Sequence, residues 1–162
     1  MTPPPDHSSR RAGGAGGASA PDLQADLCCA IVCTVPVLIT GADDLAYRLA
    51  RDIHERSARS CEPFIAVDCA RVTAFDLHRV FEQVEPQGVA FLRTIDRLAA
   101  SLQRKLNECL CSSSARVIAS SSAPLLEQVE RGVFDEVLFY RLNQIHLVAE
   151  PQPGSLQPRR RG

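Results

Sequence analysis

The stretch VLITGADDLAYRLARDIH, from Val37 to His54, decides the fold. It opens with a short apolar, partly β-branched run that ends at Gly41, which is typical of a buried strand followed by a turn. Asp43 and Asp44 come next and suit the N-cap and first turn of a helix. Apolar residues then recur at helical spacing. The stretch therefore predicts a strand, a tight turn and an amphipathic helix.

The same layout underlies phosphate-binding loops, because a helix N-terminus offers free N–H groups and the positive end of its dipole. A loop of the form G-x-x-x-x-G-K-[ST] also needs a lysine for the β and γ oxygens and a hydroxyl for Mg²⁺. This chain has no Gly-Lys pair, and Asp43 or Asp44 would lie where the anion should bind. A carboxylate there stabilises its own helix by about 0.5–2 kcal/mol and repels a triphosphate. We expect a capped helix after a core strand rather than a working nucleotide site.

The composition predicts one domain of ordinary core size. The chain has 162 residues, a formal charge of -1 and 45% hydrophobic residues, so its bulk charge gives no reason to expect nucleic-acid binding. Residues 1–24 form a Pro-, Gly- and Ser-rich stretch and residues 150–162 a Pro- and Arg-rich one. Both are predicted to be disordered tails, which leaves residues 25–149 for the domain.

We expect a cytoplasmic protein without a membrane span. The alternative, an export signal, would use Arg10 and Arg11 together with the apolar run from Leu27 to Thr40. Asp22 and Asp26 separate the two parts, and no A-x-A cleavage site follows the run. The run is also too short to cross a bilayer.

The cysteines and histidines do not form a metal-binding pattern. Seven cysteines are an odd number, and no pair has the spacing of a zinc site. We expect the thiols to be buried or half-buried small hydrophobes, with a redox role for Cys109 and Cys111 left open. The histidines are scattered singly and are expected to be structural or surface residues, namely His7, His54, His78 and His146.

Strand and helix patterns alternate along the rest of the chain, which is typical of an α/β fold with a parallel sheet covered on both faces. Four further strands are predicted at residues 63–69, 88–95, 115–120 and 143–148. Helices are predicted at residues 74–84, 98–111, 123–131 and 134–141.

In this order the segments resemble the AAA+ core of bacterial sigma-54-dependent transcription activators, the sigma-54 interaction domain. VLITG with LARDIHERSAR resembles the first strand and helix of that family, and PFIAVDCA its second strand. FEQVEPQGVAFL resembles the approach to the Walker B strand, RVIASSS the sensor strand and FDEVLFYRLNQIHL the arginine-finger segment. The resemblance runs from Val37 to Leu147 and implies a five-stranded parallel sheet of P-loop NTPase type.

The positions that carry chemistry in the family differ here. GADDLAY replaces the Walker A loop, and the resemblance places Arg93 and Thr94 where the family has the Walker B Asp-Glu pair. Ser122 takes the sensor asparagine position, and Asp135 the first of two finger arginines. A cation cannot ligate Mg²⁺, so ATP hydrolysis is expected to be lost. The resulting vestigial nucleotide site comprises Gly41, Asp43, Asp44, Arg93, Thr94, Ser122 and Arg141.

Two segments of the family are also missing from the resemblance. The long excursion with the GAFTGA loop, which engages the sigma factor, would lie between Cys69 and Phe81, where a short connection stands. The helical lid that follows in the family has no counterpart after Leu147.

The resemblance also places the end of the Walker B strand beside the phosphate loop. We therefore hypothesise that Asp43 or Asp44 forms an ion pair with Arg93 that replaces the charges of the ligand and closes the site. A guanidinium more than ~6 Å from both carboxylates would contradict this. The alternative is that the side chains are simply solvated at a strand end.

These observations leave three functions open. The first is a non-catalytic, sigma-54-activator-like module that needs no cofactor. It would regulate transcription by contact with an intact AAA+ activator or with the transcription machinery. The second is a domain that binds ATP and Mg²⁺ with weak or no hydrolysis. The third is a scaffold that acts through its tails, or a decayed gene product.

Overall fold

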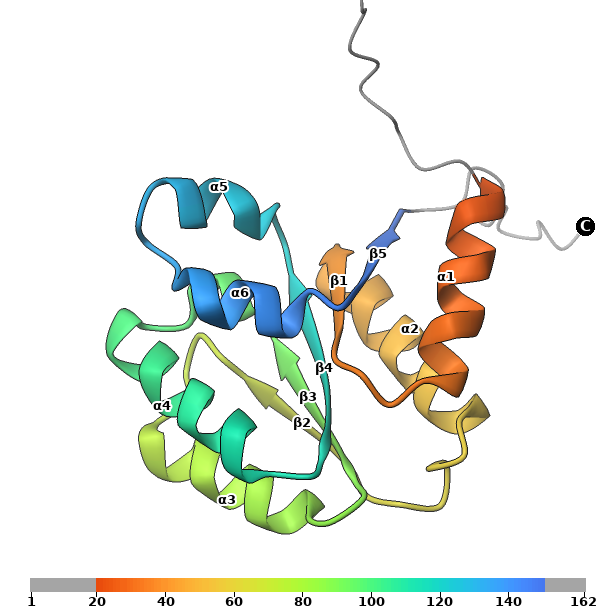
Figure 1. Ribbon diagram of the computed structural model, residues 1–162, viewed down its shortest axis with the longest axis horizontal. Coiled ribbons are helices and arrows are strands. Elements are labelled where there is room, and N and C mark those ends of the chain that lie inside the picture. The colour runs from red at the N-terminus through yellow and green to blue at the C-terminus, as the bar shows by residue number, and fades with distance from the viewer. Residues whose placement is uncertain (1–19, 151–162) are drawn as a thin grey trace, which may run out of the picture.

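Five parallel strands form the centre of the protein, in the order β2-β3-β4-β1-β5. The structure is a computed structural model that describes the backbone of residues 20–150 and the side chains of residues 23–150. Figure 1 shows helices on both sides of the sheet. The elements are α1 (Ala20–Val32), β1 (Val37–Gly41), α2 (Asp43–Arg56), β2 (Phe64–Asp68), α3 (Ala74–Val84), β3 (Val89–Arg93), the 3-10 helix η1 (Ile95–Arg97), α4 (Ala100–Ser112), β4 (Arg116–Ser121), α5 (Leu125–Glu130), α6 (Glu136–Leu142) and β5 (Ile145–Ala149).

β1 lies inside the sheet, between β4 and β5. Val37 is level with Ile118 on one side and with Ile145 on the other, and both pairings are parallel. Every strand before β5 is followed by a segment that returns along the sheet, and all pairings are parallel, so all five strands end at the same edge. The predicted order of strands and helices is therefore confirmed.

The two faces of the sheet bury two separate apolar clusters, because side chains alternate along each strand. α1 and α2 cover one face, where Ile39, Phe91 and Ile118 are fully buried. α3, α4 and α6 cover the other, where Leu38, Leu92 and Ala119 lie. This double coverage explains why β3 and β4 are apolar on both faces.

α1 was not predicted from the sequence. Its inward stripe is Leu23, Leu27 and Ala30, which recur at helical spacing, and it packs against α2 and β5. The predicted boundary between tail and domain at residues 24 and 25 falls inside this helix. The remainder of the two predicted tails, residues 1–19 and 151–162, lies outside the described residues.

The thiols are less buried than expected. Cys69 and Cys109 are buried and Cys33 is half-buried, but Cys28, Cys29, Cys61 and Cys111 are exposed. The exposed thiols lie on outward positions of α1 and α4 and in the turn before β2, so the prediction of buried cysteines is wrong for these four.

Three of the four histidines lie within the described residues, and they fit the expected structural and surface roles. His54 is buried against Phe64, and desolvation lowers its pKa. His78 is exposed next to Glu82, and His146 contacts the Thr40 hydroxyl at 2.9 Å.

Candidate functional site

The edge where the strands end carries most of the predicted site residues. β1 ends at Gly41, β3 at Arg93 and β4 at Ser121. α2 begins directly after β1, so its first turn lies at the same edge. In open parallel sheets this edge is where ligands bind, which makes it the place to examine for a nucleotide site.

Gly41 is required by the packing of β1 against β5. Its φ is +154°, a value that side chains rarely adopt, and a Cβ at this position would collide with the carbonyl oxygen of Ala149. The absence of a side chain therefore has a structural reason that is independent of any phosphate.

The N-cap of α2 differs from the prediction. Ala42 is the N-cap residue, with extended backbone and no side-chain hydrogen bond, whereas Asp43 and Asp44 occupy the first turn. Both carboxylates still lie at the positive end of the helix dipole. The carboxylate of Asp43 also has a partner on another element of the fold.

Asp43 forms an ion pair with Arg93, as hypothesised. The Arg93 Nε donates to Asp43 Oδ1 at 3.2 Å, and Nη2 donates to Oδ2, so the pair is bidentate. Among the described residues, Arg93 has no such contact with Asp44. The hydrogen bond to Asp43 raises the pKa of Arg93, and the ring of Tyr47 lies 5.8 Å from the guanidinium carbon. The guanidinium thus joins the end of β3 to the start of α2.

Thr94 is also held by a partner within the chain. It has a left-handed backbone, with φ of 50°, and its hydroxyl donates to Asp68 Oδ1 at 2.8 Å. Its N–H donates to the Ser120 hydroxyl at 3.4 Å. The hydrogen bond from Thr94 is the main cause of a lowered pKa of Asp68. Asp68 ends β2, so sequence reasoning on β1 and β3 alone did not identify it.

Ser122 is paired with Asp96 in the same manner. The Ser122 N–H donates to Asp96 Oδ1 at 3.1 Å and its hydroxyl donates to Oδ2 at 2.8 Å. Three carboxylates from this edge, Asp43, Asp68 and Asp96, are therefore each bound by a neighbouring strand end or loop. Arg93, Thr94 and Ser122 therefore all have partners within the chain.

Arg141 does not join this cluster. Its guanidinium Nη1 donates to the Asn107 carbonyl at 3.5 Å and contacts Cys111 Sγ at 2.6 Å, both on α4. α4 returns from the end of β3 to the start of β4, so its last turn lies toward the opposite edge of the sheet. Of the predicted site residues, Arg141 is the one that the structure places away from the other six.

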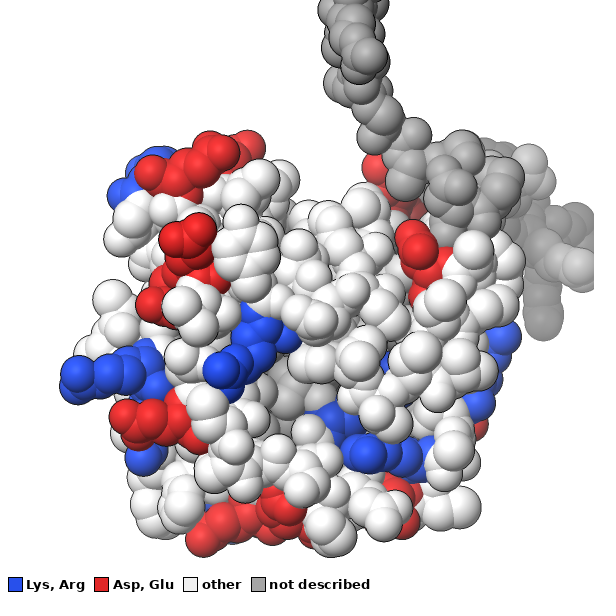
Figure 2. All heavy atoms as spheres, in the orientation of Figure 1, with Lys and Arg blue, Asp and Glu red and all other residues white. Residues whose placement is uncertain are grey.

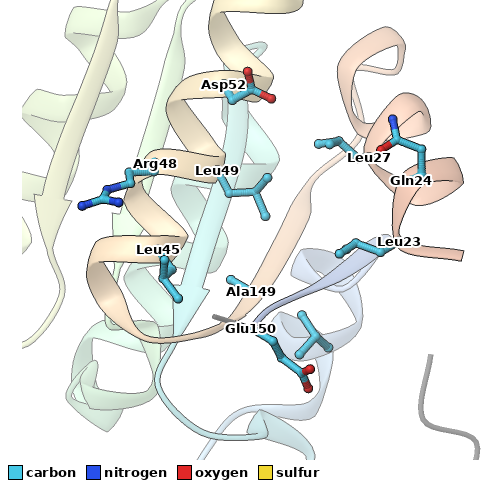
Figure 3. Close-up of a pocket in the computed structure, with 10 residues that line it drawn as sticks. Leu23, Gln24, Leu27, Leu45, Arg48, Leu49, Asp52, Ala149 and Glu150 are labelled. Carbon is cyan, nitrogen blue, oxygen red and sulfur yellow. The ribbon is translucent and has the colours of Figure 1, made fainter. Parts of the chain in front are cut away.

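A cavity of about 400 Å³ lies beside α2, between α1 and the end of β5. Figure 3 shows Leu23 and Leu27 of α1 on one side and Leu45 and Leu49 of α2 on the other. The lining is mainly aliphatic, and Glu150 is among the polar residues that border it. The stripe of apolar residues in α1 was the sequence signal for this cavity, but it is recognisable only once α1 is known to be a helix.

Two further classes of site are absent from the described part of the chain. No group of three or more histidine, cysteine or acidic side chains could hold a metal ion there. None of the helices described is long and apolar enough to cross a membrane. On the face shown in Figure 2, acidic and basic side chains are interspersed, without a continuous basic surface.

The sequence matches the Sigma-54 interaction domain over residues 17–150. The chain belongs to this family.

The relatives of this chain include the regulatory protein AtoC of Escherichia coli K12, which is 31% identical to it over 148 residues. That match covers 71% of this chain and 32% of AtoC. The HTH-type transcriptional regulatory protein TyrR of Salmonella typhimurium is 28% identical, over 73% of this chain and 28% of TyrR. The chain thus spans about a third of the length of these relatives.

Solved structures share the fold. The P-loop NTPase domain of a sigma-54 activator from E. coli superposes with a TM-score of 0.63 at 16% identity, covering 80% of this chain and 92% of that one. NtrX from Brucella abortus in complex with ADP gives a TM-score of 0.67 at 22% identity, covering 78% of this chain and 34% of NtrX. The five-stranded parallel sheet is therefore a P-loop NTPase core of AAA+ type.

Proposed function

We propose that this chain is a non-catalytic sigma-54 interaction domain that takes part in transcription regulation through protein contacts. The observation that carries the proposal is the bidentate ion pair between Arg93 and Asp43. It joins the end of β3 to the first turn of α2, the two places where the resemblance puts Mg²⁺ and the phosphates.

The ion pair opposes nucleotide binding in two ways. Phosphoryl transfer depends almost wholly on positioning and on charge stabilisation, and Mg²⁺ takes carboxylate and water oxygens as ligands. Arg93 brings a positive charge to the metal position, while Asp43 brings a negative charge to the phosphate position. A triphosphate would have to break the pair and then face the carboxylate.

The relatives support a role in regulation. AtoC and TyrR are named as regulatory proteins, and the matched domain is the one named for interaction with sigma-54. Because Arg93 and Asp43 neutralise each other at the candidate site, this chain would act by binding a protein, either an intact AAA+ activator or the transcription machinery. We propose no direct nucleic-acid contact, because the formal charge of the chain is -1 and the face shown in Figure 2 has no continuous basic surface.

A thermal melt of the purified full chain tests the proposal, with and without Mg·ATP and Mg·ADP at millimolar concentration. A ligand at a hundred times its dissociation constant stabilises the folded state by ~2.7 kcal/mol, which moves the melt of a domain of this size by a few degrees. We expect no shift and no nucleotide-dependent phosphate release. NtrX from Brucella abortus, which is described in complexes with ADP and with ATP, is the positive control when it is measured in parallel.

The second candidate is a domain that binds nucleotide with little or no hydrolysis. The observation that favours it is the aliphatic cavity of about 400 Å³ beside the first half of α2, a size typical of small-molecule sites. NtrX, which shares the fold, is described in complex with ADP. A clear shift of the melt with Mg·ADP, but no phosphate release from Mg·ATP, would replace the first proposal by this one.

A further inference from the structure

α1 is packed unevenly along its length. Its inward stripe begins with Leu23 and Leu27, which are half-buried, and ends with Ala30, which is fully buried. Burial of apolar surface is the main source of stability for a helix on a sheet. The two ends of α1 therefore differ in how completely their inward side chains are enclosed.

A buried arginine from a different element holds that C-terminal end. Arg116, the first residue of β4, is 2% exposed, and its Nη2 donates to the carbonyl oxygen of Ala30. Among the described residues it has no carboxylate partner, and its Nε has no hydrogen-bond partner at all. The last carbonyl groups of a helix lack partners within the helix and carry its negative dipole end, so the cation caps α1 across the fold.

The N-terminal half of α1 borders both the apolar core and the cavity, because Leu23 and Leu27 pack against the edge of the core cluster and also line the cavity. Leu23 and Leu27 line the cavity from α1, and Leu45, Leu49 and Val148 line it from α2 and β5. Figure 3 shows Leu23 and Leu27 on one side of this space and Leu45 and Leu49 on the other. Side chains that border a void lose contacts on that side, which weakens the attachment of this half of the helix.

We propose that α1 is a hinged strap, anchored at Ala30 by Arg116 and able to swing at residues 20–27 over the cavity. Closure would bring Leu23 and Leu27 onto Leu49 and fill the void, and opening would expose it. The strap would regulate access to the cavity, whether the edge of the sheet is closed by the ion pair of Arg93 and Asp43 or binds a nucleotide.

Hydrogen–deuterium exchange of the full chain tests the strap. In the unmodified protein we expect the amides of residues 24–27 to exchange at least about tenfold faster than those of residues 29–32. Fraying of a helix end would also give such a gradient, so a cavity-filling variant is needed. Leu49→Phe adds volume on α2 and should slow exchange at residues 24–27 several-fold, leaving residues 29–32 unchanged.

Leu126→Phe makes the same chemical change on α5 at a half-exposed position outside the cavity lining, and it should alter exchange in neither half of α1. Arg116→Gln removes the cap and should bring residues 29–32 to the fast rate of residues 24–27, while β1 and α2 stay protected. The proposal is overturned if Leu49→Phe leaves residues 24–27 unchanged, or if the Leu126→Phe control has the same effect. Continued protection of residues 29–32 in a folded Arg116→Gln chain would refute the anchor.

Discussion

At position 93 a guanidinium stands at the strand end where the resemblance implies a carboxylate, and the first turn of the next helix supplies the compensating charge. The charges of Arg93 and Asp43 compensate each other. Arg93 alone would leave a cation at the edge of the sheet, and Asp43 alone would leave an anion at the start of α2. As a bidentate pair with a nearby Tyr47 ring, they neutralise each other.

A double-mutant cycle on Asp43→Asn and Arg93→Gln should show a coupling of about 0.5–1 kcal/mol in the free energy of unfolding. The value is modest because the side chains of Arg93 and Asp43 are 38% and 36% exposed, so water screens the pair. Urea unfolding of the four proteins measures the coupling.

Asp44→Asn is the matched control for this cycle. Asp44 lies in the same first turn of α2, so its loss removes a similar interaction with the helix dipole, worth about 0.3–1 kcal/mol. Its coupling to Arg93→Gln should be close to zero. Equal coupling for Asp43 and Asp44 would show that the pair contributes only general electrostatics.

Among the helices, α2 and α3 begin differently. α3 has a full capping box, in which the Thr73 hydroxyl accepts from the Asp76 N–H while the Asp76 carboxylate accepts from the Thr73 N–H. α2 starts at Ala42, whose side chain cannot accept a hydrogen bond. The first N–H groups of α2 therefore have no side-chain cap. The carboxylate of Asp43, in the first turn, is bound to Arg93 instead.

Ala42→Ser should supply the missing cap and raise the free energy of unfolding by about 0.5–2 kcal/mol. The φ of -60° and ψ of 138° at Ala42 already suit an N-cap residue. Thermal or urea unfolding measures the gain. Ala74→Ser, one residue inside the capped α3, offers no new partner and should give no gain. No stabilisation by Ala42→Ser would mean that the free N–H groups of α2 are already satisfied by solvent.

On the scale of the whole molecule, the two apolar clusters on either side of the sheet determine which thiols are protected. Cys69 belongs to the cluster under α3 and α4, and burial raises its pKa to about 12. Cys61 is exposed in the turn before β2. The thiolate is the reactive form of cysteine, so the two thiols should differ strongly in reactivity.

Alkylation with iodoacetamide followed by mass mapping should modify Cys61 at least about a hundredfold faster than Cys69 in native buffer. A rise of the Cys69 pKa from 9.0 to about 12 lowers its thiolate fraction substantially, and burial blocks the reagent. In denaturant the two rates should converge. Equal rates in native buffer would show that the cluster under α3 opens readily.

The succession of strands and helices along the chain, and the parallel sheet, could be predicted because their signals are local. The run Val37–Ile39 and its counterparts are apolar segments bounded by turns, and such runs in alternation with helices form a parallel sheet whose ends share an edge. The placing of Arg93 near the start of α2 followed from the resemblance to the sigma-54 interaction domain. The choice of Asp43 over Asp44 did not, because neighbouring helix residues point about 100° apart and the rotation of α2 is set by its packing.

The sequence by itself thus determined the family and the parallel sheet, since both depend on local pattern and chain order, and the resemblance to the family then predicted the meeting of a carboxylate with Arg93. Only the tertiary structure decided which carboxylate pairs, that Asp68 and Asp96 hold Thr94 and Ser122, and that Arg141 turns to α4. It also revealed α1 and its cap by Arg116, which is 86 residues from Ala30 along the chain. Such contacts join side chains that no local pattern relates, and they exist only once the sheet has brought distant segments together.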